Sequence, residues 1–215
     1  MEHLIQRMDW LFNVCFSRLH LKQELPISNG HLTFLEGFYT AEEADELYTQ
    51  LLESLEWKQG TIHLFGKTHS TPRLEAFYAE KNLNYSYSGQ QLENHDFTPL
   101  LLKIKEKIEI ETAYSFNSVL VNYYRDGNDS NGWHADNEKE LGENPIIASL
   151  SFGTCRRFDL KHISKVEKLS VELKSGSLLI MSGETQHFWK HQIAKSKKIT
   201  TGRINLTFRT IRLKI

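Results

Sequence analysis

Two short segments of the sequence carry side chains that could bind a metal ion. In GWHADNE, His134 and Asp136 are two positions apart, and side chains at this spacing in an extended segment point to the same side. TQHFWKHQI offers His187 and His191, on one face of a predicted strand, as candidates for a third ligand. Two histidines and one carboxylate with open coordination positions suit non-haem Fe(II) and oxygen chemistry. A zinc hydrolase could use the same ligand types, so these residues alone leave both metals open.

A third segment, RINLTFR, adds two cations on alternate positions. Its polar face carries Arg203, Asn205, Thr207 and Arg209, while Leu206 and Phe208 face the other way. Unpaired buried charges are costly, whereas guanidinium groups pair with carboxylates in a bidentate way, so this strand suits a small dicarboxylate. Asn122 and Tyr124 in VNYY, also two apart, could add hydrogen bonds. The simpler alternatives are a surface turn at His134 and an exposed barrel edge at Arg203 and Arg209.

The elements that must position these residues are two helices followed by short strands. Thr40 and Glu43 form a capping box before a helical apolar pattern, and Thr98-Pro99 marks the start of a second helix. After residue 113 the β-rich segments are FNSVLVNYY, PIIASLSF, RRFDLKH, KLSVELK, GSLLIMSG, TQHFWKHQI and RINLTFRTI. We predict an α+β fold, with an antiparallel sandwich or open barrel behind a helical layer and a ligand site at the barrel mouth.

The composition is that of an ordinary globular protein. The 215 residues, 40% hydrophobic and 25% charged, suffice for one large domain or for a core domain with an appended arm. No apolar run approaches the roughly 18 residues of a membrane span, and the N-terminus lacks the apolar region of a signal peptide. The only cysteines, Cys15 and Cys155, suggest a reducing, cytoplasmic setting. The net charge of -1 does not indicate nucleic-acid binding, but residues 185–215 contain Lys and Arg without Asp or Glu, and a basic face attracts phosphate.

Taken together and in order, these segments resemble the AlkB family of Fe(II)/2-oxoglutarate-dependent nucleic-acid demethylases, in particular the animal homologues that repair alkylated DNA. The resemblance runs from Leu64 to Ile211 and includes LFGKTHSTPR, Tyr78, NYSYSG, VNYYRDG, WHADNE, PIIASLSFG, GSLLIMSG, TQHFWKH and RINLTFR. It implies a double-stranded β-helix (jelly-roll) core, with helices packed on one side and an N-terminal nucleotide-recognition lid. We expect residues 31–215 to form a single dioxygenase domain with 57–95 as the lid, and residues 1–30 to form an arm of unknown role.

The resemblance also implies roles for individual residues. His134, Asp136 and His191 would bind Fe(II); the family's distal histidine follows a bulky residue by two positions, which selects His191 over His187. The positions that bind 2-oxoglutarate correspond to Asn122, Tyr124, Arg203, Asn205 and Arg209. The resemblance leaves open which arginine binds which carboxylate, and it implies O2 as the co-substrate.

Four further residues would contact the substrate. Glu138 matches an acidic position that reads the damaged base, and Tyr87 matches an aromatic that stacks on the base opposite the ring of His134. Tyr85 would line the same pocket. Phe65, at a predicted hairpin tip, would fill the gap left when a base is flipped out of a duplex. Without the resemblance, the simplest interpretation of these aromatics is ordinary core and sheet packing.

Basic residues near the predicted site are candidates for phosphate contacts, which position a strand without reading its sequence. They are Arg156, Arg157, Lys161, Lys190, Lys195, Lys197 and Lys198. The sequence departs from its relatives at Ala135, where they have a long polar side chain, and at Asn137, where many have an acid or a lysine. These departures concern base and lesion preference and leave the metal-ligand types intact.

The implied activity is oxidative demethylation of N-alkylated DNA bases of the 1-methyladenine and 3-methylcytosine type by direct reversal, with release of formaldehyde and succinate. The DNA could be single- or double-stranded. The alternatives are an RNA demethylase of the same chemistry, an Fe(II)/2-oxoglutarate hydroxylase of a protein or small molecule, and a catalytically silent nucleic-acid-binding module. We expect a monomer that does not bind membranes and is cytoplasmic or, in a eukaryote, nuclear.

Overall fold

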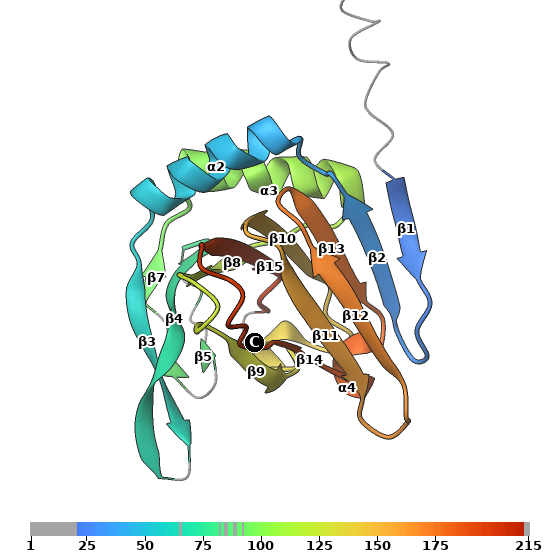
Figure 1. The fold of residues 1–215 in the computed structure, drawn as a ribbon. Helices are drawn as coiled ribbons and strands as arrows, with labels where there is room; N and C mark the ends of the chain where they lie inside the picture. The colour runs from blue at the N-terminus through green and yellow to red at the C-terminus, as the bar shows by residue number, and fades with distance from the viewer. Residues whose placement is uncertain are drawn as a thin grey trace, which may run out of the picture.

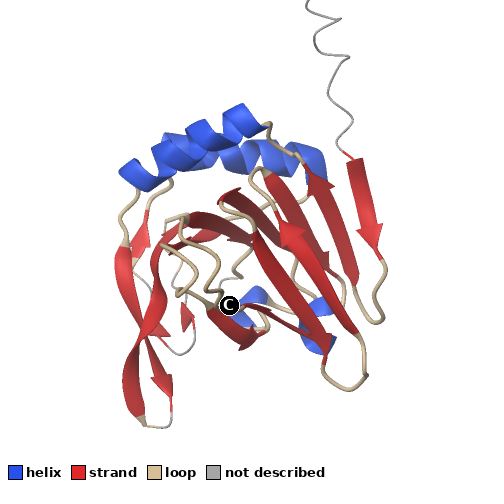
Figure 2. Ribbon diagram, in the orientation of Figure 1, coloured by secondary structure: helices blue, strands red, loops and turns tan. Residues whose placement is uncertain are grey.

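The computed structural model describes residues 21–212 except 65, 82, 84, 85, 88, 89 and 92. For residues 21, 63, 64, 86, 87, 90 and 91 it describes the backbone alone. Two β-sheets face each other at the centre of the molecule, and two helices lie across the outer face of the larger sheet (Figure 1). Strands far outnumber helices in this part of the chain, as Figure 2 shows.

The larger sheet has nine strands in the order β1-β2-β13-β10-β15-β8-β4-β3, with β7 paired to β4. These strands are β1 (Leu21–Leu25), β2 (His31–Glu36), β3 (Lys58–Leu64), β4 (Lys67–Ala79), β7 (Asn94–His95), β8 (Ser118–Tyr124), β10 (Ile147–Gly153), β13 (Ser177–Ser182) and β15 (Arg203–Arg209). Neighbours are antiparallel except β4 and β7. The edge strand β1 lies within the segment expected to form an N-terminal arm, so at least this part of the segment belongs to the core sheet.

The smaller sheet has four strands in the order β12-β11-β14-β9. They are β9 (Asn131–His134), β11 (Arg156–His162), β12 (Lys168–Leu173) and β14 (Trp189–Ile193), and a separate pair is formed by β5 (Ser86–Tyr87) and β6 (Gln90–Gln91). From β8 to β15 the chain places β8, β10, β13 and β15 in the larger sheet and the other four strands in the smaller one. This arrangement confirms the predicted double-stranded β-helix.

Both predicted helices begin where the sequence indicated, and one segment predicted as strand is helical instead. Helix α2 (Ala41–Ser54) begins with the predicted capping box, and α3 (Pro99–Thr112) begins at the predicted proline after its Thr98 cap. The first half of TQHFWKHQI was predicted as strand, which is wrong: Thr185–Phe188 forms the one-turn helix α4, and β14 begins only at Trp189. In the part of the chain that the structure describes, the remaining helical turn is the 3-10 helix η1 (Lys139–Leu141). Within the described residues, no helix has the length and apolar character needed to cross a bilayer.

The alternation of side chains along the strands of the larger sheet separates an apolar face from a polar one. On β15, Ile204, Leu206 and Phe208 join a core that also contains residues of α2 and α3. The intervening residues of β15 point to the space between the two sheets and line a cavity there; they are Arg203, Asn205, Thr207 and Arg209. An apolar inter-sheet core, which includes Leu160, Leu179 and Trp189, fills the rest of that space. The fold therefore presents polar groups to one opening of an otherwise apolar sandwich.

Candidate active site

Strand pairing in the smaller sheet brings together the three predicted metal ligands. His134 is the last residue of β9 and lies opposite His191 of β14, while Asp136 follows in the next loop. One ligand atom from each residue lies within 4.8 Å of the other two. The two imidazole rings are 4.3 Å apart between centroids. By contrast, His187 is exposed on α4 instead of sharing a strand face with His191.

Both imidazoles are suited to bind a metal ion because they stay neutral near pH 7. Burial lowers the pKa of His191 to about 3, with His134 adding to the effect, and burial also lowers the pKa of His134. The Nδ1 atom of His134 lies 2.7 Å from the carbonyl oxygen of Gly132. Since a carbonyl oxygen can only accept, Nδ1 carries the hydrogen and Nε2 keeps its lone pair. Metal ligation requires this deprotonated nitrogen.

The Asp136 carboxylate is buried and ionised. Burial by itself would raise the pKa of this carboxyl, but the Arg209 guanidinium and the two imidazoles outweigh burial and lower the pKa to about 2. Oδ2 of Asp136 lies 2.9 Å from Nη2 of Arg209, and the backbone N–H of Asp136 donates to Oε1 of Gln186. Oδ1 has no hydrogen-bond partner. The carboxylate is thus held by one oxygen, and the other is left to bind a ligand.

The second predicted arginine, Arg203, lies at the opposite end of β15. Its guanidinium is fully buried, donates to Ser151 Oγ at 2.9 Å, and lies 5.3 Å from the ring centroid of Tyr124. Burial lowers the pKa of Arg203 to about 10, so the side chain remains a cation at neutral pH. Its Nε and Nη1 atoms have no hydrogen-bond partner. Because β15 lies between β10 and β8, the alternative of an exposed edge strand is wrong.

A single cavity between the two sheets is lined both by the candidate metal ligands and by the residues predicted to bind 2-oxoglutarate. Its lining includes the three candidate metal ligands and all five residues predicted to bind 2-oxoglutarate: Asn122, Tyr124, Arg203, Asn205 and Arg209. Buried atoms without hydrogen-bond partners on Asp136, His191 and Arg203 belong to this lining. Such atoms are costly unless a ligand satisfies them. A divalent metal ion at the histidine-carboxylate cluster, together with a dianion along β15, would do so.

Of the four predicted substrate residues, the structure describes the side chain of Glu138 alone. Glu138 is partly buried at the start of η1 and is not among the residues that line this cavity. Phe65 and Tyr85 lie outside the described residues, and only the backbone of Tyr87 is described, in β5. The substrate roles of these four residues stay predictions.

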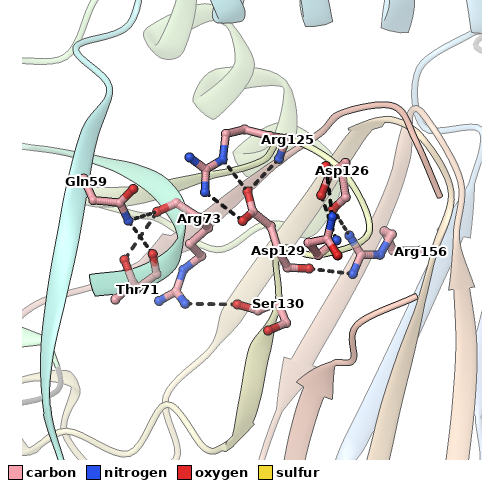
Figure 3. Close-up of polar contacts among 9 residues, drawn as sticks. Gln59, Thr71, Arg73, Arg125, Asp126, Asp129, Ser130 and Arg156 are labelled. Carbon is pink, nitrogen blue, oxygen red and sulfur yellow. Dashed lines mark hydrogen bonds and ion pairs between the residues drawn. The ribbon is translucent and has the colours of Figure 1, made fainter. Parts of the chain in front are cut away.

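Arg73, on β4, is a buried site residue that the sequence reasoning missed. Its Nε donates to Asn122 Oδ1 at 2.7 Å, so the amide NH2 of Asn122 is left for the cavity. Its Nη1 lies 3.4 Å from Asn131 Oδ1 and also reaches the carbonyl of Ser130, toward which it points in Figure 3. The signal was present in TPRLEAF, where polar residues alternate as they do in RINLTFR.

Arg156, which was predicted to contact phosphate, is a structural residue instead. It is only 2% exposed, and its guanidinium donates to the carbonyls of Asp126 and Asp129 (Figure 3). It also donates to the carbonyl of Ala194. The same turn is fixed by an ion pair between Arg125 and Asp129 at 2.8 Å. Arg156 therefore joins β11 to the turn that leads into β9, and so to His134.

Other candidate phosphate contacts remain predictions. Arg157 pairs with Asp159 at 2.8 Å. The Nζ atom of Lys161 lies 4.2 Å from the ring centroid of Trp133, the residue before His134. Lys161 also pairs in register with Lys190 on β14. The outer face of the smaller sheet, on the side away from the cavity, thus carries two neighbouring lysines.

A double-stranded β-helix with two histidines, one carboxylate and two buried guanidinium groups in one cavity defines the class of Fe(II)/2-oxoglutarate oxygenases. Residues 31–209 match the family described as the 2OG-Fe(II) oxygenase superfamily. The chain belongs to this superfamily and, within it, to the AlkB homologues. The family and the histidine-carboxylate cluster imply Fe(II) and 2-oxoglutarate as cofactors.

Three relatives illustrate the similarity. "Alpha-ketoglutarate-dependent dioxygenase alkB homolog 3" is 41% identical in Bos taurus and 40% in Homo sapiens, with 86% of this chain and 68% of each relative covered. "DNA oxidative demethylase ALKBH2" of Bos taurus is 38% identical, with 79% of this chain and 65% of the relative covered. The solved structure described as "The structure of OsALKBH1" is similar in fold, with a TM-score of 0.58 at 17% identity over 87% of this chain and all of that chain.

The buried position of Arg156 predicts a loss of stability when its guanidinium is removed. In Arg156→Met, three carbonyls lose their donor, and we expect the free energy of unfolding to fall by about 3 kcal/mol. Urea denaturation followed by circular dichroism measures this change. Lys161→Met, on the outer face of the same strand, is the control and should change stability by less than about 0.5 kcal/mol. An Arg156→Met protein of unchanged stability with weaker oligonucleotide binding would restore the phosphate role.

Proposed function

We propose that the protein removes methyl groups from base nitrogens in DNA, with Fe(II) and 2-oxoglutarate as cofactors and O2 as co-substrate. The observation that carries the proposal is the cavity in which His134, Asp136 and His191 face the guanidinium groups of Arg203 and Arg209. The names of the relatives, which include DNA oxidative demethylases, support DNA as the substrate. The RNA, protein and small-molecule alternatives lack a specific supporting observation.

The two arginines bind different ends of 2-oxoglutarate. Arg209 contacts Asp136, so its guanidinium lies beside the metal ligands and faces the carboxylate next to the keto group. Arg203 is at the other end of β15 with Ser151 and Tyr124, and it binds the distal carboxylate in the bidentate manner typical of guanidinium groups.

Between the arginines, paired residues in the middle of the sheet bind the body of the cofactor. Asn205 lies opposite Asn122 in the β15–β8 register, and both line the cavity. Arg73 fixes the amide of Asn122 through its Oδ1, which presents the NH2 group as a donor. The apolar side chains of Leu120, Phe158 and Ile193 line the same cavity and limit the entry of water.

When bound, Fe(II), 2-oxoglutarate and O2 supply an oxidation in which 2-oxoglutarate loses carbon dioxide to become succinate and a methyl C–H becomes C–OH. The hydroxymethyl group on the base nitrogen is a hemiaminal, whose C–N bond breaks to release formaldehyde and the repaired base. The chain contributes binding and orientation. His134 keeps its ring fixed through Nδ1–H and the Gly132 carbonyl, so its ligand nitrogen faces the cavity.

We extend the proposal to base recognition. The methylated base stacks between Tyr87 and the ring of His134, with Tyr85 beside it and Glu138 facing its cationic edge. Residues 57–95 serve as the lid. The β3–β4 hairpin supports this role because it extends beyond the rest of the larger sheet (Figure 1). Phe65 fills the gap left by the flipped base in a duplex.

The central test is loss of the methyl group from a 3-methylcytosine or 1-methyladenine oligonucleotide, measured by mass spectrometry with Fe(II), 2-oxoglutarate and oxygen. We expect repaired base, formaldehyde and succinate in equal amounts. The substrate is defined by comparing turnover on single-stranded DNA, duplex DNA and RNA of the same sequence. Asp136→Ala should abolish turnover, while His187→Ala, which removes an exposed histidine nearby, should leave it unchanged. Binding of all three oligonucleotides without succinate formation would favour the silent binding module.

If Arg203 binds the distal carboxylate and Arg209 the carboxylate next to the keto group, variants of the two residues should differ in their preference between 2-oxoglutarate and a shorter analogue. Wild-type protein should bind 2-oxoglutarate more tightly than 2-oxobutyrate, which lacks the distal carboxylate. Arg203→Met should remove that preference, at a cost of roughly 10- to 100-fold in affinity for 2-oxoglutarate, because a hydrogen-bonded charge pair is lost. Arg209→Met should weaken both ligands and keep the preference. Anaerobic calorimetry with Fe(II) measures both affinities, and a preference lost in Arg209→Met instead would reverse the assignment.

A further inference from the structure

A second cavity opens beside the cofactor cavity, on the side of the β3–β4 hairpin. Its volume is about 160 Å³, and it is lined by residues of β3 and β4 and by Leu120 of β8. Leu120 also lines the cofactor cavity, so the two cavities are neighbours across one side chain. The second cavity lies on the side from which the proposed lid would deliver a base.

Glu75 is a buried acidic residue that lines this second cavity. In the sheet register, Glu75 of β4 lies opposite Asn122 of β8, which lies opposite Asn205 of β15. Residues paired in this way point to the same face, so Glu75 extends the polar row of the cofactor site by one strand. The Glu75 carboxylate therefore lies on the side of the site that faces the proposed lid. It is not among the residues that line the 2-oxoglutarate cavity.

The Glu75 carboxylate is buried without a full set of partners. The residue is 7% exposed, and its Oε2 atom accepts no hydrogen bond. The nearest cation is Nη2 of Arg73, 3.5 Å from Oε2, which is an ion pair without hydrogen-bond geometry. Arg73 directs its other donors to Asn122, Ser130 and Asn131. A buried carboxylate oxygen in this state lacks a donor.

The backbone of β3 makes room for this carboxylate. The β3–β4 register shifts between Gln59 and Thr61, so Gly60 lies at an irregularity of the strand pair. A Cβ atom on Gly60 would lie 1.9 Å from Oε1 of Glu75 and 2.4 Å from its Cδ. Glycine at this position therefore lets the carboxylate line the cavity.

The other charged groups of the cavity do not satisfy Glu75. Lys58 pairs with Glu93, and both side chains are more than half exposed. His95 packs against the ring of Tyr78 at 5.4 Å between centroids. Glu56 adds a further carboxylate to the rim. Because Lys58 offsets Glu93, the cavity combines the buried acid Glu75 with one further carboxylate, Glu56, and this favours a cationic ligand that donates hydrogen bonds.

We propose that Glu75 is a specificity-determining residue that accepts a hydrogen bond from the exocyclic amine of a cationic methylated base. This inference rests on the proposed function. Glu75 would be a second carboxylate, beside Glu138, that contacts the cationic base. A cationic amino base supplies both the missing donor and a compensating charge. A neutral base with a carbonyl at the same position supplies neither and places its oxygen against the carboxylate.

Two methylated pyrimidines that present different groups at C4 provide the test; the C5 methyl group of thymine is their other difference, and it is the same in the assays of every variant. 3-Methylcytosine is cationic and carries an amine where neutral 3-methylthymine carries a carbonyl. The measurements are kcat/KM for each base in one single-stranded sequence and anaerobic binding of the same labelled oligonucleotides by fluorescence anisotropy. In Glu75→Gln we expect the preference for 3-methylcytosine over 3-methylthymine to fall by roughly tenfold or more, the size of a lost hydrogen bond to a charged group.

Two further variants make the test specific to the Glu75 carboxylate. Glu93→Gln removes an exposed carboxylate from the same cavity and should leave the preference unchanged. Gly60→Ala should lower the preference as Glu75→Gln does, because its methyl group displaces the Glu75 side chain. Thermal melting followed by circular dichroism establishes that each variant is folded, and 2-oxoglutarate affinity establishes that the cofactor site is intact.

The outcomes separate this inference from the proposed function. If wild-type protein demethylates 3-methylcytosine and Glu75→Gln lowers the rates on both bases by the same factor, Glu75 acts only as the partner of Arg73 and the inference is overturned. A preference that falls equally in Glu93→Gln would also overturn it. If wild-type protein demethylates neither base, the proposed function fails and the inference fails with it.

Discussion

The buried ion pair between Asp136 and Arg209 is the interaction on which the site depends. Asp136 follows a strand of the smaller sheet and Arg209 ends a strand of the larger one, so the pair joins the two sheets at the cavity. Removing one partner of such a pair leaves an uncompensated charge and costs about 3–5 kcal/mol. The guanidinium keeps the carboxylate ionised, while the second carboxylate oxygen stays available. One contact thus stabilises the sandwich, prepares a metal ligand and places a cation beside the metal site.

The larger sheet supports this chemistry because its two faces differ. Val121 and Leu206 face the helices, while Asn122 and Asn205 face the cavity. The apolar face supplies hydrophobic stabilisation, and the opposite face can then carry unpaired polar groups that would otherwise be destabilising. The cavity therefore contains buried polar atoms without hydrogen-bond partners, an arrangement that favours specific binding of a metal ion and a dianion.

Much of this site was predictable from the sequence because strand periodicity fixes which side chains share a face. The alternation in RINLTFR correctly predicted the polar face of β15, whereas the choice of His191 over His187 came from the resemblance alone. The strand assigned to 185–188 failed because four residues are too few for a periodicity to distinguish a helical turn. Arg156 was misjudged because a charge on a predicted strand does not reveal whether backbone carbonyls from distant loops surround it. The position of Glu75 depended on pairing between β4 and β8, which local sequence does not encode.

The most direct measurement of the central claim is the coupling between metal and cofactor binding. Anaerobic calorimetry of 2-oxoglutarate, with and without Fe(II), should show that the metal strengthens cofactor binding in wild-type protein and in His187→Ala. Asp136→Asn retains the size of the side chain and removes its charge, and it should lose both metal binding and this coupling. Unchanged Fe(II) affinity and coupling in Asp136→Asn would contradict the account, because metal and cofactor would then not share the site built around Asp136.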